Sequence, residues 1–155
     1  MKPKFTISKS TALKQYKTIE EIADIVSYSS KTNPLITKIL EENTDCLFSI
    51  HTKNELNNIK DHSRVLFLAQ GWTEQDILEL KNINKFVVDN EPDLDILLET
   101  INKHNLKINL LLRLKLKERS VKTERHFVFG MTEKVINKRI QELNNENILS
   151  LGIHF

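Results

Sequence analysis

The stretch "VSYSSKTNPLITKILEEN", residues 26–43, shows the pattern from which the fold can be predicted. Its small side chains predict a short strand that ends in Lys31, and Asn33 followed by Pro34 predicts an abrupt change to a helix. Behind the proline, one apolar stripe is formed by Leu35, Ile36, Ile39 and Leu40. The stretch therefore predicts one strand–helix unit with a lysine at the carboxyl end of the strand.

The same unit recurs along the chain. Strands are predicted at 25–31, 46–52, 65–71, 85–90, 108–116 and 148–155, with starts separated by roughly 20 residues until a last gap about twice as long. Helical patterns lie between them: one is capped by Thr73, one starts at Pro92 and one is capped by Thr132. A further helix is predicted around 11–23. Such alternation indicates parallel strands joined by right-handed crossovers.

Two architectures fit this alternation. One is an open doubly wound sheet, and the other is a (β/α) barrel, which normally needs about 250 residues and eight units. In the fifth strand, Asn109, Leu111 and Arg113 share one face, and the opposite face is apolar. Ser27, Ser29 and Lys31 share one face of the first strand in the same way. These polar faces favour a barrel-like pocket, although the pattern alone does not separate the two architectures.

Composition narrows the function classes. The chain has 155 residues with 39% hydrophobic and 28% charged residues, which suits one soluble domain. A net charge of +2 gives no electrostatic case for nucleic acid or an anionic membrane as a partner. Cys46 is the single cysteine, and no apolar run is long enough to span a membrane, so a cytoplasmic protein is expected. Neither a nucleotide-binding glycine loop nor histidine spacing typical of a metal site occurs in the sequence.

Functional residues of parallel α/β proteins gather at the carboxyl ends of the strands. The predicted strands place five candidates there: Lys31, His51, Gln70, Asp89 and His154. A partly buried lysine at such a position can lose its proton and form a Schiff base with pyridoxal phosphate. Small neighbours would admit the cofactor ring. The alternative reading of Lys31 is a solvated lysine at a strand end.

Seven segments, in order, resemble one enzyme family. The segments are "YSSKTNP", "SIHTKNEL", "VLFLAQGWTEQDILEL", "FVVDNEPDLDIL", "LLLRLKL", "FGM" and "LGIHF". Together they are similar to the N-terminal part of the pyridoxal-phosphate decarboxylases with an alanine-racemase-type barrel, which include ornithine, diaminopimelate and carboxynorspermidine decarboxylases. The resemblance implies an N-terminal strand and helix at 1–24 and a partial (β/α) barrel at 25–155, which stops at the sixth strand, without the family's C-terminal β-domain.

Carried over by position, the resemblance implies that Lys31 is the Schiff-base lysine and that Arg113 lies close to the pyridine ring. Glu55 matches the acidic residue of the second βα turn, while Ser49 replaces an aspartate there, which puts the usual partner of Arg113 in doubt. Val128 replaces a lysine. His154 matches the first histidine of the family's His-x-His element. It is therefore a candidate cofactor contact, and the alternative interpretation is that it belongs to a frayed chain end. His51 is a candidate for contact with substrate or phosphate, or a hydrogen-bonded loop residue.

The family's glycine-rich phosphate loops and the acidic partner of the pyridine nitrogen have no match in this sequence. The parent activity implied by the resemblance is decarboxylation of a basic or diamino acid, and this chain alone is expected to need a complementing chain or a homodimer. Two other functions stay open. One is a non-catalytic pyridoxal-phosphate binder, because "SSKTNP" is close to the lysine segment of single-domain barrel proteins. The other is a non-enzymatic interaction module derived from a decarboxylase.

Overall fold

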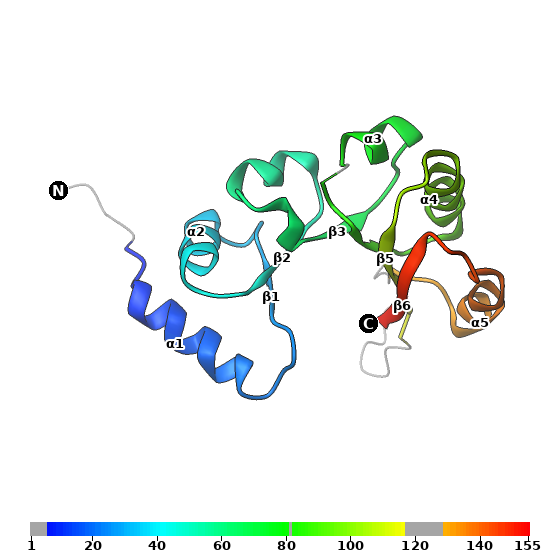
Figure 1. Ribbon diagram of the computed structural model, residues 1–155. Helices are drawn as coiled ribbons and strands as arrows, with labels where there is room; N and C mark the ends of the chain where they lie inside the picture. The colour runs from blue at the N-terminus through cyan, green and yellow to red at the C-terminus, as the bar shows by residue number, and fades with distance from the viewer. Residues whose placement is uncertain (1–5, 81, 117–128) are drawn as a thin grey trace, which may run out of the picture. The chain divides into compact units, whose positions relative to one another are not determined.

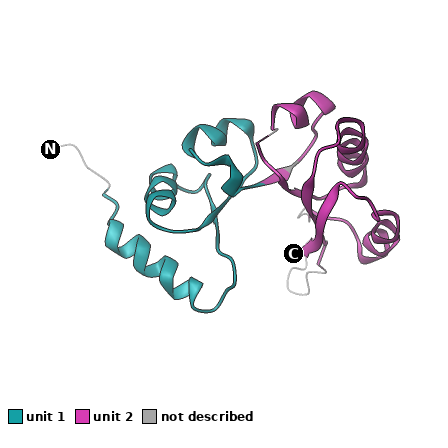
Figure 2. Cartoon of the chain, in the orientation of Figure 1, with its two compact units in different colours: residues 1–66 teal, residues 67–155 magenta. Residues whose placement is uncertain are grey.

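The computed structural model describes residues 6–80, 82–116 and 129–155, and in this part of the chain helices and strands alternate (Figure 1). The chain divides into two compact units, residues 1–66 and residues 67–155 (Figure 2). The boundary falls inside β3 (Val65–Ala69). All six predicted strands are present, each somewhat shorter than its apolar run suggests.

The first unit begins with α1 (Lys9–Glu20) and then has one strand–helix–strand sequence: β1 (Ser27–Ser29), α2 (Pro34–Asn43) and β2 (Leu47–Ile50). Two 3₁₀ helices follow, η1 (Lys53–Asn58) and η2 (His62–Arg64). Strands β1 and β2 pair in parallel, with Ser29 opposite Ser49. Helix α1 packs against α2.

The second unit contains the main part of β3 and six further elements. These are α3 (Glu74–Glu79), β4 (Lys85–Val88), α4 (Glu91–His104), β5 (Ile108–Arg113), α5 (Glu133–Glu142) and β6 (Ile148–His154). Strand β3 pairs with β4, β4 with β5 and β5 with β6, all in parallel. Each crossover therefore returns the chain to the same end of the sheet through a helix.

The strand order is β1-β2-β3-β4-β5-β6, the order of the sequence itself. A doubly wound sheet reverses its strand order at a switch point, whereas a (β/α) barrel adds strands consecutively. The consecutive order decides between the two architectures that the sequence left open, and it gives an incomplete barrel-type sheet of six parallel strands.

Local sequence explains where the helices begin. Asn33, Thr73, Asn90 and Thr132 each accept a hydrogen bond from the first turn of the helix that follows, and proline occupies the first turn of α2 and α4. Such caps typically stabilise a helix by about 1 kcal/mol each. The predicted caps at Thr73 and Thr132 are confirmed.

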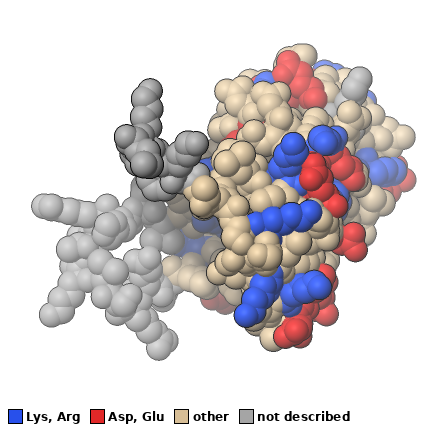
Figure 3. All heavy atoms as spheres, turned by 90° about the vertical axis from the view of Figure 1, so that its left-hand side faces the viewer, with Lys and Arg blue, Asp and Glu red and all other residues tan. Residues whose placement is uncertain are grey.

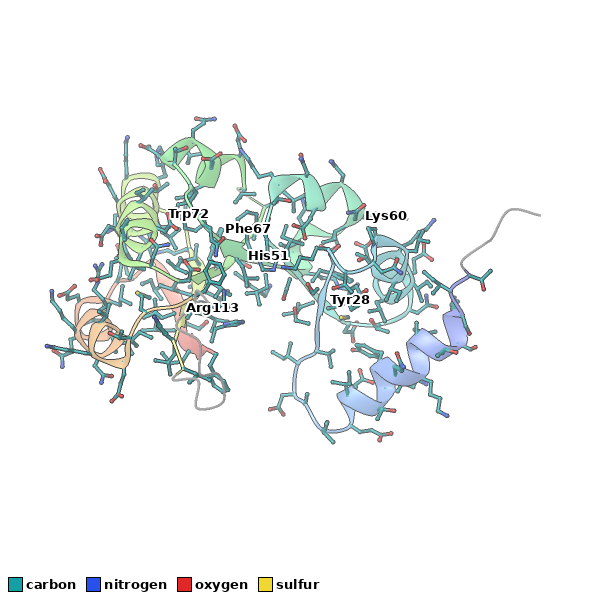
Figure 4. All side chains as sticks on the ribbon, turned by 180° about the vertical axis from the view of Figure 1, so that it is seen from behind. Tyr28, His51, Lys60, Phe67, Trp72 and Arg113 are labelled. Carbon is teal, nitrogen blue, oxygen red and sulfur yellow. The ribbon has the colours of Figure 1, made fainter. Side chains whose placement is uncertain are left out.

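The core of the second unit lies on the apolar face of β5, where Ile108, Leu110 and Leu112 are buried, as their alternation predicts. Trp72 stacks on Phe67 with ring centroids 6.3 Å apart (Figure 4) and meets Phe86 edge-on at 5.6 Å. Trp72 is buried, and its indole N–H donates to the Asp93 carbonyl at 3.0 Å, which allows the ring to pack inside.

Arg64 holds together the end of α2 and the start of β2 in the first unit. Its guanidinium donates to the carbonyls of Glu41, Thr44 and Cys46 at 2.6–2.9 Å. It also lies over the Phe48 ring, 5.1 Å from the centroid. Cys46 and Phe48 are fully buried and belong to the core of the first unit.

Several predicted element boundaries were wrong: β2, β3 and β4 each end two residues earlier than predicted, at Ile50, Ala69 and Val88. The first strand ends at Ser29 rather than Lys31, and the fifth ends at Arg113, after which Leu114 makes only an isolated parallel bridge to Met131. The first helix covers 9–20 rather than about 11–23, because Ser8 provides its cap. Residues 6–8 are neither helix nor strand, and the rest of the predicted N-terminal strand lies outside the described residues, as do Val128 and His126.

Acidic and basic side chains are interspersed on the face of the molecule seen in Figure 3, in agreement with the small net charge. No helix within the described residues has the length and apolar character needed to cross a membrane.

Candidate functional site

The predicted site residues fall into two groups. Lys31, Ser49, His51 and Glu55 belong to the first unit, and Arg113 and His154 belong to the second. Five of them lie within two residues of the carboxyl end of a strand, where parallel α/β proteins place their functional groups, and Glu55 lies in η1, after β2.

Lys31 lies in a tight turn between β1 and α2. The turn is closed by the Thr32 N–H, which donates to the Ser29 carbonyl at 3.1 Å. The Ser30 N–H donates to the Ser49 carbonyl at 3.1 Å and so continues the pairing with β2. The hydroxyl groups of Ser30 and Thr37 lie 3.0 Å apart, and both residues are fully buried, which anchors the turn to α2. Lys31 is therefore carried on rigid backbone.

The side chain of Lys31 is exposed, not partly buried as the sequence suggested. Because the strand ends two residues earlier, Lys31 occupies a central position of the turn. Within the described residues its amine has no hydrogen bond and no ion pair, so it is available to an incoming group.

Small hydroxyl side chains lie beside this turn on β1 and β2. The Ser27 and Ser49 hydroxyl oxygens are 2.6 Å apart, and Ser29 is opposite Ser49 in the strand register. Ser49, which stands where the resemblance expects an aspartate, therefore contributes a neutral hydrogen-bonding group instead of a charge. Serine side chains keep this edge of the first unit polar and low in volume.

Glu55 has a structural role that the sequence did not reveal. Its Oε1 accepts hydrogen bonds from the backbone N–H groups of His51 and Thr52, at 3.2 and 3.1 Å, and from the Thr52 hydroxyl at 3.0 Å. The carboxylate thus caps η1 and fixes the turn that follows β2. Its Oε2 is buried and has no hydrogen-bond partner in the described part of the chain. His51 is half-buried beside this turn.

In the second unit, the strand register aligns four polar residues across neighbouring strands. Ala69 is opposite Val88 and Val88 opposite Leu112, so the residues that follow them, Gln70, Asp89 and Arg113, stand at one level. Arg113 is itself opposite His154. The prediction that Gln70, Asp89 and His154 mark strand ends is confirmed, and Arg113 lies in the same row.

The Gln70 and Asp89 end of this row is tied into a hydrogen-bond network. Gln70 Nε2 and Asn90 Nδ2 donate to the two carboxylate oxygens of Asp89, each at 2.9 Å. Asp93, which is 4% exposed, accepts from the Gly71 N–H at 2.9 Å and from Asn90 Nδ2 at 2.6 Å. Sequence reasoning missed Asn90 and Asp93, although Asn-Glu-Pro is the signature of a capped helix start. The network fixes the two turns and satisfies both carboxylates.

Arg113 lies at the other end of the row and is half-buried. Its guanidinium carbon is 5.4 Å from the centroid of the Phe129 ring, a cation–π contact. At Gly130, where φ is 107°, the backbone passes close to the end of β5. A Cβ on this residue would be 2.8 Å from the Lys115 backbone nitrogen and 2.9 Å from the Arg113 carbonyl oxygen. The Met131 N–H donates to that oxygen at 2.8 Å. The "FGM" segment therefore has a geometric role at this site.

His154 stands beside Arg113 on β6, with its backbone paired up to the last strand residue. Burial lowers the pKa of His154, and the positive charge of Arg113 lowers it further. The imidazole Nδ1 is buried without a hydrogen-bond partner among the described residues. A neutral imidazole next to a guanidinium offers one cation and one uncharged hydrogen-bonding group.

Comparison with known proteins gives a fold likeness. No family model matches the sequence, and no curated protein matches it. Diaminopimelate decarboxylase from M. jannaschii in complex with L-lysine superposes with a TM-score of 0.72 at 20% identity, over 96% of this chain and 40% of that chain. The lysine/ornithine decarboxylase from Vibrio vulnificus in complex with cadaverine gives 0.65 at 20% identity, over 94% and 40%.

The arginine decarboxylase of Paramecium bursaria Chlorella virus gives a TM-score of 0.69 at 16% identity, again over 94% of this chain and 40% of that chain. This chain thus spans about 40% of the length of the structures it matches. The expected resemblance is confirmed at the level of the fold. The described chain is an incomplete parallel α/β barrel that is similar, along almost its whole length, to part of the basic amino acid decarboxylases.

Proposed function

We propose that this chain provides the lysine-bearing part of a pyridoxal-phosphate-dependent decarboxylase that acts on a basic or diamino acid. The observation that supports the proposal most directly is the position of Lys31, an exposed amine on a rigid turn at the carboxyl end of β1, in a fold similar to amino acid decarboxylases. The serines beside the turn fit a planar ring, because they add little volume and offer hydroxyl groups.

In this proposal Lys31 would hold pyridoxal phosphate, because its amine would bind the aldehyde group of the cofactor. The cofactor supplies an electron sink for the carbanion that is left when carbon dioxide departs. The turn holds the Lys31 backbone, and the hydroxyl groups of Ser27 and Ser49 lie on the neighbouring strands to orient the bound ring. Arg113 and His154 are proposed as further cofactor contacts, and Ser49, His51 and Glu55 as substrate contacts or their supports.

A complementing chain or a second copy is part of the proposal, as is a cytoplasmic location. The described site residues are divided between two units, and the chain covers about 40% of the matched decarboxylases. Strand β6 pairs with β5 on one side; Leu149 on this strand is 60% exposed, and Phe155, directly after it, is 82% exposed. An apolar strand at the edge of the strand order is a surface on which another chain can add.

Reductive trapping tests the role of Lys31. The purified chain is mixed with pyridoxal phosphate, its absorbance spectrum is recorded, and borohydride is added before the labelled peptide is identified. The proposal expects a Schiff-base band and a label on Lys31, both lost in Lys31→Ala. Lys38→Ala is the matched control, because Lys38 is another exposed lysine, on the helix that follows. Equal labelling of Lys31 and Lys38, or an unchanged band in Lys31→Ala, would contradict the proposal.

The interaction module is the second candidate function, and the exposed apolar residues of β6 favour it. Light scattering of the purified chain across a concentration series, with and without pyridoxal phosphate, separates the two. Self-association without any Schiff-base band supports the module. A band on Lys31 supports the cofactor site whatever the oligomeric state.

A further inference from the structure

The described residues provide no anion for the guanidinium of Arg113. Among them it has no ion pair within 4.0 Å and no side-chain hydrogen bond, and its contact is the Phe129 ring. Two other arginines of the described residues have acceptors close by: Arg139 pairs with Asp95 at 2.5 Å, and Arg64 donates to three carbonyls. A half-buried arginine normally has such partners, since its five N–H groups are costly to leave unpaired in a poorly hydrated place.

The acidic residue next in the row does not neutralise it. Asp89 stands at the same level on β4, but its two carboxylate oxygens already accept hydrogen bonds from Gln70 and Asn90. The guanidinium carbon of Arg113 lies instead over the Phe129 ring, 5.4 Å from its centroid. A ring is not an oxyanion, so the N–H groups that a guanidinium uses to bind oxyanions keep that capacity.

His154 adds a second unpartnered group at the same point. It is opposite Arg113 in the β5–β6 register, on strands that are spaced about 4.8 Å apart in a sheet. Both residues fall on the same face of the sheet, because paired residues of parallel strands share a face. The buried Nδ1 of His154 has no partner in the described part of the chain. One cation and one imidazole therefore stand on neighbouring strands of the same face, with hydrogen-bonding capacity that no described residue uses.

We infer that Arg113 and His154 together bind the carboxylate group of a small ligand. The net charge of the site favours a singly charged carboxylate over a doubly charged phosphate as the bound oxyanion. Arg113 supplies one positive charge, the neutral imidazole of His154 supplies hydrogen bonding without charge, and Asp89 lies one strand away as an anion. A singly charged, planar carboxylate matches this set, and it fits the fork of a guanidinium with two parallel hydrogen bonds. A doubly charged phosphate would be repelled more strongly by Asp89.

The identification of that carboxylate as part of an amino acid rests on the proposed function. The carboxylate site itself does not, because it rests on the strand register and unpartnered groups of Arg113 and His154 and not on the cofactor contacts proposed for them. Binding of a carboxylate at this site in the absence of pyridoxal phosphate is therefore a separate observation from the labelling of Lys31, and either can fail without the other.

The pKa of His154 provides the readout. The side chains of the five histidines are followed by NMR through pH titrations in sodium acetate, sodium phosphate and sodium chloride at equal ionic strength, and His154 is assigned with His154→Gln. Acetate bound at Arg113 offsets the positive charge that lowers the pKa of His154, so this pKa is expected to rise by about 0.5 in acetate relative to chloride. The other histidines are expected to respond equally to the three salts.

Two variants of Arg113 and one control sharpen the test. Arg113→Gln is expected to raise the pKa of His154 in chloride and to abolish the response to acetate. Arg113→Lys keeps the positive charge but lacks the planar guanidinium that can form two parallel hydrogen bonds. The pKa of His154 should therefore stay lowered in this variant, and acetate should bind about tenfold or more weakly. Lys138→Gln is the control, since it removes an equal charge from an exposed site on α5, and it should behave as the unmodified chain does.

The inference is overturned if the His154 pKa is the same in acetate and chloride, or if the acetate response survives in Arg113→Gln. A larger response to phosphate than to acetate would overturn the preference for a carboxylate. Backbone amide spectra of each variant show whether it folds. Should Arg113→Gln fail to fold, the comparison of salts in the unmodified chain and in Arg113→Lys still decides the outcome.

Discussion

The hydroxyl groups of Ser30 and Thr37 lie 3.0 Å apart with neither residue exposed to solvent. This single contact joins the turn that carries Lys31 to the helix behind it. Because both hydroxyl groups are buried, each depends on the other for its hydrogen bond, and the position of the turn depends on the pair.

Replacing Thr37 by valine should destabilise the first unit. Valine has nearly the same shape as threonine but leaves the Ser30 hydroxyl buried without its partner, so we expect a loss of about 1–3 kcal/mol in the free energy of unfolding. Urea unfolding followed by circular dichroism measures it. Thr18→Val is the control, because the Thr18 hydroxyl is exposed and donates to the Lys14 carbonyl of its own helix. Equal losses of unfolding free energy in the two variants would show that the buried Ser30–Thr37 contact stabilises the chain no more than the exposed hydroxyl of Thr18 does.

A Cβ at Gly130 would strike the backbone of Lys115 at 2.8 Å, and φ of 107° is unfavourable for any residue with a side chain. Gly130→Ala is therefore expected to lower the free energy of unfolding by about 2–4 kcal/mol and to disturb Arg113. Gly71→Ala is a matched control: φ is 64° but nothing lies within 4 Å, so only the conformational cost of about 1 kcal/mol applies. A larger loss for Gly71→Ala than for Gly130→Ala would contradict the close approach.

Arg139 is 9% exposed on α5 and reaches back to α4, where it pairs with Asp95 at 2.5 Å and with Glu91 at 3.7 Å. The hydrogen bond with Asp95 raises the pKa of Arg139 above its usual value. Arg139→Met keeps the packing of the aliphatic part of the side chain but removes the charge. The partner carboxylates of Asp95 and Glu91 are largely solvated, so the removed ion pairs are partly screened by water. We expect a loss of about 1–2 kcal/mol in unfolding free energy at low salt, smaller in 1 M NaCl.

The exposed neighbour Lys138 is the control for that change. Lys138→Met should leave the unfolding free energy within about 0.5 kcal/mol of the unmodified chain. Chemical denaturation of both variants at two salt concentrations makes the comparison. If the salt dependence of Arg139→Met is no different from that of the unmodified chain, then the ion pairs contribute nothing measurable.

His154 should make stability depend on pH. Its pKa is lowered in the folded chain by burial and by Arg113, so the unfolded chain binds a proton first as the pH falls. The stabilisation is complete above the unfolded pKa of about 6.5 and declines as the pH falls toward the folded pKa. The unfolding free energy should therefore fall more steeply below that value in the unmodified chain than in His154→Gln. Parallel curves for the two chains would show that His154 does not titrate differently on folding.

Much of the fold follows from the sequence because its signals are local. Apolar runs located all six strands, and the caps at Thr73 and Thr132 depend on hydrogen bonds within a single turn. The strand order required the tertiary structure, since alternation alone fits both an open sheet and a barrel. The ends of the strands were misjudged at Lys31 because a turn closed by Thr32 competes with continued pairing, and residue type does not reveal that competition.

The site was only partly accessible to sequence reasoning. Residues at strand ends could be named from the sequence. The contacts of Phe129 and Gly130 with Arg113 could not, because these residues are far apart in the sequence and no local pattern encodes such a contact. Glu55 was matched to a site residue, and its carboxylate proves to cap a 3₁₀ helix. The roles of Lys31, Arg113 and His154 in binding a cofactor stay predictions.

The single tryptophan and the single cysteine of the chain fall in different units. Trp72 lies in the aromatic cluster of the second unit, so its fluorescence reports the loss of that packing. Cys46 is fully buried in the first unit, where burial raises the pKa of its thiol, so a thiol reagent can reach it only when that unit opens. The unmodified protein thus carries one intrinsic reporter in each half, and an unfolding experiment that records both will show whether the halves open together or in succession.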